Sequence, residues 1–277
     1  MTKLKIPLAG VIGNPISHSK SPKVHGHWLR RYGLPGHYVP LHVEEGDLRN
    51  VLRAMPQMGF VGVNLTLPHK VTALQIADHH SDRAILIGAA NTLTFREDGK
   101  IHADNTDGYG FLANLKQGAP DWDPKAGPTA VLGAGGAARA VIVALAEVGV
   151  PEILLTNRTR PKADALRAEF GTRIKVVDWV QAGNMIEEAT TVVNTTSLGM
   201  VGQPELRVPL DGLQPGTVVN DIVYTPLETP LLRTAREMGC VAVDGLGMLL
   251  HQATPGFERW FGHRPEVDNE LRQVVLR

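Results

Sequence analysis

Short runs of β-branched and apolar residues alternate with amphipathic segments along the whole chain of 277 residues. The runs are Leu8–Ile12, Tyr38–Val43, Gly62–Thr66, Thr129–Leu132, Glu152–Thr156, Lys175–Val177, Thr191–Thr195, Val218–Ile222 and Val241–Asp244. An amphipathic segment after each short strand is typical of parallel sheets, because parallel strands need a helical crossover. The sequence therefore predicts an α/β fold, with enough residues for two domains of about 100–150 residues each.

Charge and cysteine content exclude several classes of protein. The 28 basic and 28 acidic residues balance, so the chain has no overall positive field that would attract nucleic acid or an anionic membrane. The single cysteine, Cys240, allows neither an internal disulfide nor a zinc site built on several thiolates. The first apolar run stops at Gly13 without a cleavage signature, and the longest apolar stretch, Thr129–Val150, is broken by glycines and charges. We therefore predict a soluble, cytoplasmic protein without nucleic-acid or membrane partners.

A glycine-rich turn follows the apolar run at Thr129–Leu132. Gly133, Gly135 and Ala138 occupy the three small positions of a G-x-G-x-x-A pattern that leads into an Ala/Val-rich segment. Small residues there allow a tight turn and the close approach of a pyrophosphate, and the N-terminus of the following helix favours negative charge. The motif predicts a Rossmann-type dinucleotide site, although glycine-rich turns also occur for structural reasons alone.

The end of the next predicted strand indicates which dinucleotide binds. Asn157, Arg158 and Thr159 begin 24 residues after Gly133, where NAD sites usually carry an acid on the ribose 2′-hydroxyl. An arginine can instead hold a 2′-phosphate through two hydrogen bonds, whereas an acid would repel it. The sequence therefore favours NADP, with Thr159 and Lys162 adding contacts. A solvated surface turn is the alternative interpretation.

Three polar clusters follow predicted strands in the N-terminal part, where open α/β sheets bind their ligands. In Ser17–Pro22, three serines exceed what one helix cap needs, so binding of a hydroxylated or carboxylate ligand competes with simple capping. In Val63–Lys70, the lysine falls in the first turn of a predicted helix, where the helix dipole disfavours a cation. Lys70 is therefore either a solvated side chain or a group with a task such as proton transfer. The third cluster, Gly88–Thr92 with Asp104–Gly108, is also explained by Asx turns alone.

Taken together and in order, these motifs resemble the shikimate dehydrogenase family along nearly the whole chain. They are GNPISHSKSP, NLTLPHK, GAANT, DNTDG, GAGGAARA, NRT, NTTSLGM and DGLGMLLHQA. The resemblance implies an α/β enzyme of two domains separated by a cleft. Residues 1–106 plus 248–277 would form the substrate domain and residues 107–247 the Rossmann NADP-binding domain. From composition alone, the Gly/Pro-rich stretch 118–128 predicts a boundary loop.

The resemblance also implies the reaction and the residues that carry it. The reaction is the reversible NADPH-dependent reduction of 3-dehydroshikimate to shikimate, in aromatic amino-acid and chorismate biosynthesis. By motif, Lys70 and Asp107 would form the catalytic pair. Substrate would contact the side chains of Ser19, Ser21, Thr66, Lys70, Asn91, Asp107, Tyr224 and Gln252. NADP would contact Asp82, Gly133, Ala134, Gly135, Gly136, Ala137, Asn157, Arg158, Thr159, Lys162, Ile222 and Gly245.

The chain departs from the family pattern at three places. Gly26 stands where an asparagine is usual, His69 replaces a commoner apolar or aromatic residue, and Pro161-Lys162 occupies a stretch where an arginine is frequent. None of these removes a proposed catalytic group. The last one predicts a weaker preference for NADP over NAD than in the family at large.

Reduction of a ketone needs a hydride from the cofactor and a proton from the protein. A free lysine is almost fully protonated at neutral pH, so Lys70 is the predicted donor, and Asp107 either orients it or shares its proton.

Three other functions are alternatives to this one. A related enzyme would prefer quinate, an aminated analogue or another cyclic hydroxy acid. A non-catalytic dinucleotide-binding regulator would not need both Lys70 and Asp107. A tRNA-linked reductase is disfavoured by the balanced charge.

The histidines do not form a metal motif. His18, His25 and His27, or the adjacent His79 and His80, lack the carboxylate-histidine spacing of zinc enzymes. The prediction is that no metal is bound. Monomer and homodimer remain equally open.

Overall fold

The structure is a computed structural model, and it describes residues 6–277. Its internal contacts divide the chain into two compact units. The first contains the chain up to Thr106 together with Leu250–Arg277, and the second contains Asp107–Leu249. The resemblance had placed the second boundary two residues earlier, at 247/248.

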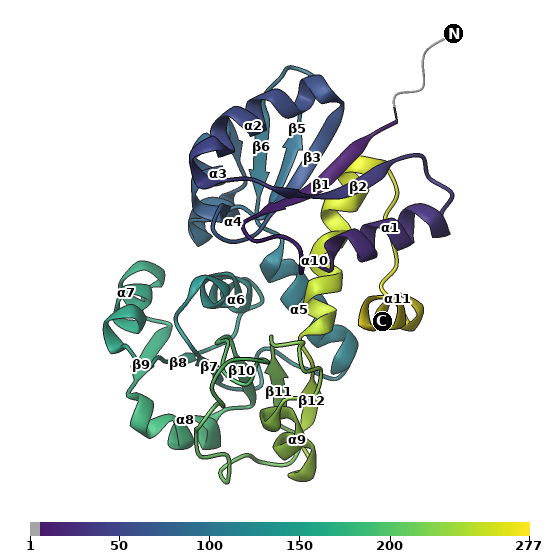
Figure 1. Cartoon of the computed structure of the whole chain (residues 1–277). Helices are drawn as coiled ribbons and strands as arrows, with labels where there is room; N and C mark the ends of the chain where they lie inside the picture. Colours follow the sequence, from purple (N-terminus) through teal and green to yellow (C-terminus); the bar gives the residue numbers. More distant parts are fainter. Residues whose placement is uncertain (1–5) are drawn as a thin grey trace. The chain divides into compact units, whose positions relative to one another are not determined.

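The first unit is built on a six-stranded sheet in the order β2-β1-β3-β5-β6-β4. Its strands are β1 (Leu8–Gly13), β2 (His37–His42), β3 (Phe60–Leu65), β4 (His79–His80), β5 (Thr92–Phe95) and β6 (Ile101–Asp104). Its helices are α1 (Ser21–Arg31), α2 (Leu48–Ala54), α3 (Lys70–Ile76), α4 (Asp82–Ile87), the end of α10 (Leu246–Phe261) and α11 (Asn269–Leu276), with 3₁₀ turns at Glu45–Asp47 and Met55–Met58. Figure 1 shows these elements in purple and blue, with α10 and α11 returning in yellow from the end of the chain.

The alternation of strands and helices predicted parallel pairing, which is right for β1, β2 and β3. β5 was not among the predicted strands. β5 runs antiparallel to both β3 and β6. For β5 and β6 the physical reason is the short connection from Phe95 to Ile101, since a turn of this length can join only antiparallel neighbours. Gly99 adopts the left-handed conformation that this turn requires, at φ 78°.

Two cores cover the faces of this sheet. On one face α2 and α3 bury Leu48, Leu52 and Ile76 against strand residues such as Val63 and Leu93. The other core is aromatic and joins α1 to α10. Its rings are His25, Trp28, Tyr38, Phe257 and Trp260. Trp260 approaches the sheet so closely that a Cβ on Gly62 would lie 1.9 Å from its indole nitrogen. The glycine in β3 is what lets this helix dock.

The sequence of the last 30 residues, Met248–Arg277, predicts helical segments interrupted at Pro255. At Pro255 this prediction is wrong. α10 runs through it without a break. A proline inside a helix removes the hydrogen bond to the carbonyl four residues earlier, here that of His251. The hydroxyl of Thr254 donates to this carbonyl oxygen at 2.9 Å and satisfies it.

The second unit contains a parallel six-stranded sheet in the order β12-β11-β10-β7-β8-β9. Its strands are β7 (Thr129–Leu132), β8 (Ile153–Thr156), β9 (Ile174–Val177), β10 (Thr191–Asn194), β11 (Val218–Asp221) and β12 (Val241–Val243). Its helices are α5 (Asp107–Gly118), α6 (Gly136–Glu147), α7 (Arg160–Phe170), α8 (Ala182–Glu188), α9 (Pro230–Glu237) and the start of α10, with a 3₁₀ turn at Trp179–Gln181. Counted from β7, this is the doubly-wound order 3-2-1-4-5-6 of Rossmann folds, so this prediction is confirmed.

The composition shift at residues 118–128 does not mark a boundary between the units. Helix α5, which precedes it, belongs to the second unit and buries Phe111 and Leu115 in the core of that sheet. The division falls instead at Thr106/Asp107, where the composition does not change. Within residues 6–277, every helix is too short or too polar to cross a membrane.

Candidate functional site

The predicted substrate residues of the first unit gather at one edge of its sheet. β1 and β3 are parallel, so their carboxyl ends meet at this edge, and the antiparallel β5 begins there. Backbone hydrogen bonds tie the loops together: Thr66 donates to Ile12, Leu65 to Asn91 and Ala90 to Lys70. Ser19, Thr66, Lys70 and Asn91 therefore lie on loops that support one another.

The two serines stand at the start of α1, where Pro22 in the first turn favours the helix. The hydroxyl of Ser19 accepts a hydrogen bond from the Ser21 backbone N–H at 3.3 Å. Ser21 is buried, and its hydroxyl lies in hydrogen-bond contact with Tyr38. Burial raises the pKa of Tyr38 well above its usual value, although the Ser21 contact opposes the shift. The Tyr38 hydroxyl, a neutral donor, binds Oδ1 of Asn64 at 2.7 Å.

Asn64 continues this polar chain across the sheet. Its side-chain nitrogen donates to the carbonyl of Asn91 and to the hydroxyl of Thr92, both at 3.1 Å. Thr92 in turn lies 3.2 Å from the hydroxyl of Thr106. The buried network thus runs from the serine motif to the end of β6, and every link in it is made within the first unit.

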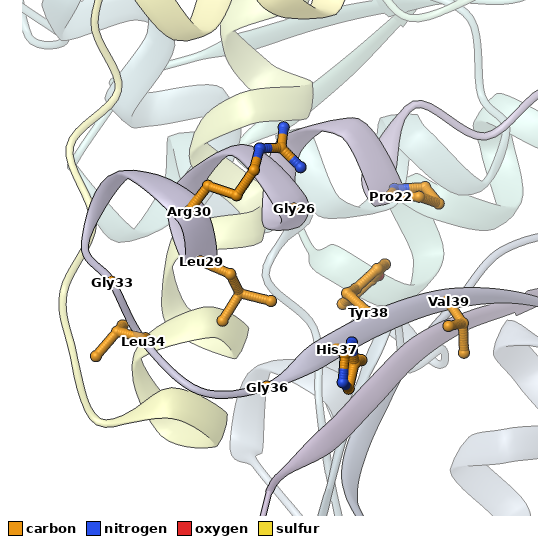
Figure 2. Close-up of a pocket in the computed structure, with 10 residues that line it drawn as sticks. All are labelled: Pro22, Gly26, Leu29, Arg30, Gly33, Leu34, Gly36, His37, Tyr38 and Val39. Carbon is orange, nitrogen blue, oxygen red and sulfur yellow. The ribbon is translucent and has the colours of Figure 1, made fainter.

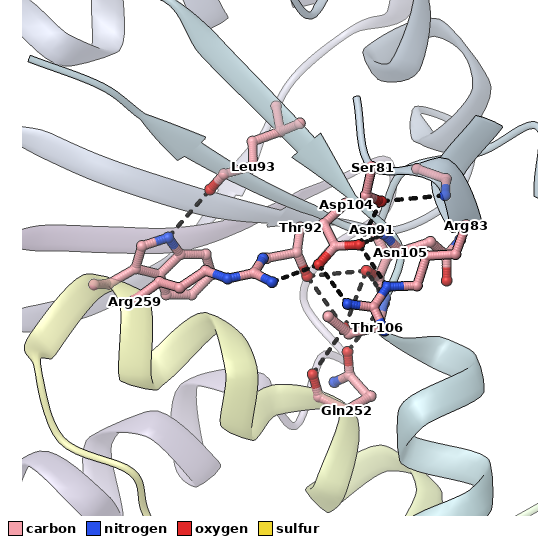
Figure 3. A network of polar contacts seen from close by, with 12 residues as sticks. Ser81, Arg83, Asn91, Thr92, Leu93, Asp104, Asn105, Thr106, Gln252 and Arg259 are labelled. Atoms are coloured by element: carbon pink, nitrogen blue, oxygen red, sulfur yellow. Dashed lines mark hydrogen bonds and ion pairs between the residues drawn. The ribbon is translucent and has the colours of Figure 1, made fainter. Parts of the chain in front are cut away.

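Asn91 is the centre of the network, as Figure 3 shows. Its Oδ1 accepts from the backbone N–H of Thr106 at 2.8 Å and from the hydroxyls of Thr92 and Thr106. Its side-chain nitrogen donates to Oε1 of Gln252 at 3.2 Å. The Thr106 hydroxyl also contacts the backbone carbonyl of Gln252 at 2.8 Å. The structure therefore brings Asn91 and Gln252 together and fixes the orientation of both amides.

Lys70 begins α3, in the first helical turn as the sequence predicted. Its backbone carbonyl accepts from Ala90, one residue before Asn91, so its place relative to the Asn91 network is fixed. The neighbouring His69 is buried and holds the carbonyl of Val43 at 2.9 Å. The unusual histidine thus serves to anchor the turn that presents Lys70.

The glycine-rich turn of the second unit follows β7. In the sheet β7 lies beside β10, and the strand order reverses between these two strands. Open α/β sheets bind ligands outside the carboxyl ends of such strands. Gly133 has φ 105°, and a Cβ there would lie 2.7 Å from a methyl group of Thr196, so glycine is required. At Gly135 and Gly136, nothing lies within 4 Å of the Cβ position. This open backbone at the N-terminus of α6 fits the pyrophosphate of a dinucleotide.

The cations after β8 differ in what they contact. Asn157 closes the turn, since its Oδ1 accepts from Ala134 N–H at 3.1 Å and its nitrogen donates to the Thr159 carbonyl. Arg160 forms ion pairs with Asp178 and Asp164. Arg158 is exposed and, like Lys162, has no ion pair or side-chain hydrogen bond within residues 6–277. The two cations predicted to hold a 2′-phosphate are therefore available to an anion.

The segment after β11 is held by a buried carboxylate. Asp221 accepts from the Thr229 hydroxyl at 2.7 Å, the Asn194 side chain at 2.9 Å and the backbone of Val223 at 3.0 Å. Burial without a cationic partner raises the pKa of Asp221, and these hydrogen bonds offset only part of the shift. They order the stretch that carries Ile222 and Tyr224. Burial also raises the pKa of Tyr224.

Gly245 touches the same stretch. A Cβ on it would lie 2.2 Å from the carbonyl oxygen of Ile222, so only glycine allows the ends of β11 and β12 to come this close. Ile222 and Gly245, which the resemblance assigned together to the nicotinamide, are thus in contact.

Asp82 does not join the other predicted cofactor residues within one unit. It is exposed at the start of α4, in the first unit. Figure 2 shows a groove of about 580 Å³ between α1 and β2, and none of the residues that line it is a predicted substrate residue. It is lined by Pro22, Gly26, Leu29, Arg30, Gly33, Leu34, Gly36, His37, Tyr38 and Val39. Gly26, one of the departures from the family pattern, is part of this lining. Across residues 6–277, no group of three histidine, cysteine or acidic side chains is arranged to hold a metal.

Several residues that hold this site together had no role predicted from the sequence, namely Tyr38, Asn64, Thr92, Thr106, Asp104, Arg259 and Asp221. Asn64, Thr92, Asp104 and Thr106 stand inside the polar clusters described above, and their polarity beside predicted strands was the available signal. No local signal connects Tyr38 or Arg259 to the site, because their partners are distant in the sequence.

Comparison with known proteins gives consistent matches. Residues 11–93 match the family described as "Shikimate dehydrogenase substrate binding domain", residues 122–201 match "Shikimate / quinate 5-dehydrogenase", and residues 245–274 match "Shikimate 5'-dehydrogenase C-terminal domain". A shikimate dehydrogenase (NADP(+)) of Cereibacter sphaeroides is 68% identical over 99% of this chain and 98% of its own.

Solved structures agree with these matches. The Thermus thermophilus shikimate 5-dehydrogenase in complex with NADP(H) and shikimate is 36% identical, with a TM-score of 0.86 over 97% of this chain and 98% of its own. The Corynebacterium glutamicum quinate dehydrogenase in complex with NAD is 31% identical, with a TM-score of 0.90 over 97% of this chain and 98% of its own. The fold is therefore shared by enzymes named for different substrates and cofactors.

Proposed function

The chain belongs to the shikimate dehydrogenase family, and we propose that it catalyses the reversible NADPH-dependent reduction of 3-dehydroshikimate to shikimate. The observation that carries this proposal is the buried polar network that joins Ser21, Asn91 and Gln252 at one sheet edge. Such a network orients hydroxyls and amides before a ligand arrives, which suits a small ring with several hydroxyls and a carboxylate.

In this proposal Ser19 and Ser21 bind the substrate carboxylate, while Thr66, Asn91 and Gln252 bind ring substituents. Tyr224 is a further proposed substrate contact. The hydroxyl of Ser19 is already oriented by the Ser21 backbone, and the amide of Gln252 by Asn91. These contacts reduce the entropy that substrate binding would otherwise cost.

The second unit would hold NADP. The open backbone at Gly135 and Gly136 accepts the pyrophosphate, with Gly133, Ala134 and Ala137 forming the rest of the turn. Arg158 and Lys162, whose side chains make no ion pair or hydrogen bond within residues 6–277, hold the 2′-phosphate beside Asn157 and Thr159. Ile222 and Gly245 line the nicotinamide, and Asp82 is a further proposed contact. When bound, the cofactor supplies the hydride.

Lys70 and Asp107 complete the chemistry. Lys70 donates its ammonium proton to the oxygen of the ketone as that oxygen gains negative charge, and takes the proton back in the reverse direction. Asp107 orients this lysine and the substrate hydroxyl, or shares the proton with them as a coupled pair. The start of α3 is fixed by the bond from Ala90 to the Lys70 carbonyl, so the ammonium group extends from a rigid turn.

An assay of the purified protein tests the proposal directly. Nicotinamide absorbance is followed with shikimate and quinate, each combined with NADP and NAD. We expect high turnover with shikimate and NADP alone. Equal turnover on quinate or with NAD would keep the dehydrogenase and overturn the specificity. Binding of NADPH and shikimate without turnover would favour a regulator.

We also propose a cytoplasmic location, because the single cysteine indicates a reducing compartment.

A further inference from the structure

Asp104 is a buried carboxylate with an unusual number of donors. Its side chain is 1% exposed at the end of β6. It accepts from the Ser81 hydroxyl at 2.6 Å, from Arg83 at 2.9 and 3.3 Å, from Arg259 at 2.6 Å and from the backbone of Asn105 at 2.8 Å. Figure 3 shows the two guanidinium groups reaching it from α4 and from α10.

The two arginines keep this carboxylate ionised. Burial by itself raises the pKa of Asp104, but hydrogen bonds from Arg83, Ser81 and Arg259 outweigh it and hold the pKa far below the usual range. One arginine would suffice to neutralise one carboxylate. The second, Arg259, comes from a segment 155 residues later in the chain. Its main contribution is therefore to connect α10 to the end of β6, since the charge of Asp104 is already balanced by Arg83.

The place of Arg259 on α10 gives this connection a consequence. Gln252 precedes it by seven residues, which is close to two helical turns, so both side chains lie on one face of the helix. At Arg259 the helix is held to Asp104 by an ion pair. At Gln252 it contacts Asn91 and Thr106. Fixing Arg259 therefore fixes the rotation and the height of α10 at Gln252.

Asp104 also fixes the partners of Gln252. The Asp104 backbone carbonyl accepts from Asn91 N–H at 3.1 Å, and its side chain accepts from Asn105 N–H. Asn105 in turn donates to the carbonyl of Ala89 at 2.9 Å. Thr106, the next residue, contacts both Asn91 and Gln252. The same residue thus holds both sides of the contact, Asn91 through its backbone carbonyl and Arg259 and Asn105 through its carboxylate.

We propose that Arg259 is a positioning residue for substrate recognition, which acts through Asp104 to hold Gln252 against Asn91. The inference rests on the proposed function, because it takes these two amides as contacts of the cyclic hydroxy acid. Arg259 itself does not touch the substrate. It sets the distance between two groups that do.

The first test is Arg259→Met, which keeps an unbranched apolar stem and removes the charged guanidinium. We expect the KM for shikimate to rise about tenfold, the loss of roughly one well-made hydrogen bond. The value of kcat should stay within about threefold, and the KM for NADP should not change. Arg259→Lys, which keeps a cation, should recover part of the shikimate affinity.

Arg53→Met is the matched control. Arg53 also forms a two-point ion pair in the first unit, with Asp78 at 2.7 and 3.0 Å, but neither residue contacts the network of Asn91. A similar loss of thermal stability in both variants, with the KM for shikimate raised only in Arg259→Met, would support the positioning role. An unchanged KM in Arg259→Met, or an equal rise in Arg53→Met, would overturn it.

A double-mutant cycle checks that Asp104 is the intermediary. If it is, the double variant should have a KM for shikimate less than about twofold above that of Asp104→Asn alone. A KM raised by the product of the two single effects would contradict the proposal. Shikimate binding by calorimetry is measured on every variant, which also covers variants of low activity. A wild-type protein that neither turns over nor binds shikimate would overturn the proposed function itself. An active wild type with an unaffected Arg259→Met would overturn only the positioning role.

Discussion

The side-chain nitrogen of Asn91 donates to Oε1 of Gln252 at 3.2 Å, although 161 positions separate the two residues in the sequence. The contact joins the loop after α4 to the C-terminal helix α10 within one compact unit. Because Asn91 is also bound by Thr92 and Thr106, neither amide can rotate without losing hydrogen bonds. The proposed substrate pocket is therefore ordered by the protein itself before a ligand binds.

Removing the proposed proton donor tests the mechanism. Lys70→Ala should lower kcat by roughly 10²–10⁴-fold, the usual contribution of a general acid, with only a modest change in shikimate affinity. Steady-state kinetics and calorimetric binding of shikimate give the two quantities. Near-normal turnover would remove Lys70 from the mechanism, whereas lost binding with normal kcat would make it a binding residue only.

The three cations after β8 should separate by their contacts. Arg158→Gln and Lys162→Gln should each raise the KM for NADP by about tenfold, because each removes a charge-assisted hydrogen bond to the 2′-phosphate. The KM for NAD should change little. Arg160→Gln is the control, since Arg160 is engaged with Asp178 and Asp164. An effect of Arg160→Gln as large as that of Arg158→Gln would contradict this assignment of the phosphate site.

The open space at Gly135 allows binding to be separated from folding. Within residues 6–277, no atom other than those of Gly135 and its chain neighbours lies within 4 Å of the Cβ position, and its φ of −94° suits alanine. Gly135→Ala should therefore leave the melting temperature unchanged while it raises the KM for NADP, because the methyl group occupies the path of the pyrophosphate. Gly133→Ala, by contrast, should lower the melting temperature, because its Cβ would lie 2.7 Å from a methyl group of Thr196. Normal NADP affinity in a folded Gly135→Ala would place the pyrophosphate elsewhere.

Two buried aspartates should show opposite pH dependence of stability. The pKa of Asp221 is raised by burial, so the folded state binds more protons than the unfolded state above pH ~4, and stability falls as pH rises through the raised value. Asp221→Asn removes this penalty and keeps an oxygen for Asn194 and Val223. We expect it to raise the melting temperature by about 2–4 °C at pH 7–8, with the gain disappearing below pH ~4.

For Asp104 the sign reverses. Its pKa is lowered, so its contribution to stability is present above its unfolded value and is lost as pH falls through the folded one. Asp104→Asn should therefore lower the melting temperature at neutral pH. In acid, the difference in melting temperature between this variant and the wild type should become smaller. Melting curves from pH 3 to pH 8 measure both variants. A destabilised Asp221→Asn at every pH would show that the charged form is needed in the fold.

Local patterns predicted much of this fold. All nine predicted strands are present, with ends that differ by one or two residues. The short strands β4, β5 and β6 were missed, since two to four residues are too few for a periodic signal. The continuity of α10 through Pro255 was also missed, because it depends on the hydroxyl of Thr254 taking over a carbonyl.

The sequence by itself determined the α/β class, the glycine-rich turn of a dinucleotide site and the arginine that favours a 2′-phosphate. These are local properties of strand period, turn chemistry and charge. Only the tertiary structure decided which groups meet: Trp260 against Gly62, Arg259 on Asp104, and Gln252 beside Asn91. The reason is physical. Each of these contacts joins residues more than 150 positions apart, and it forms only when a buried helix face and a sheet edge of matching shape and polarity come together.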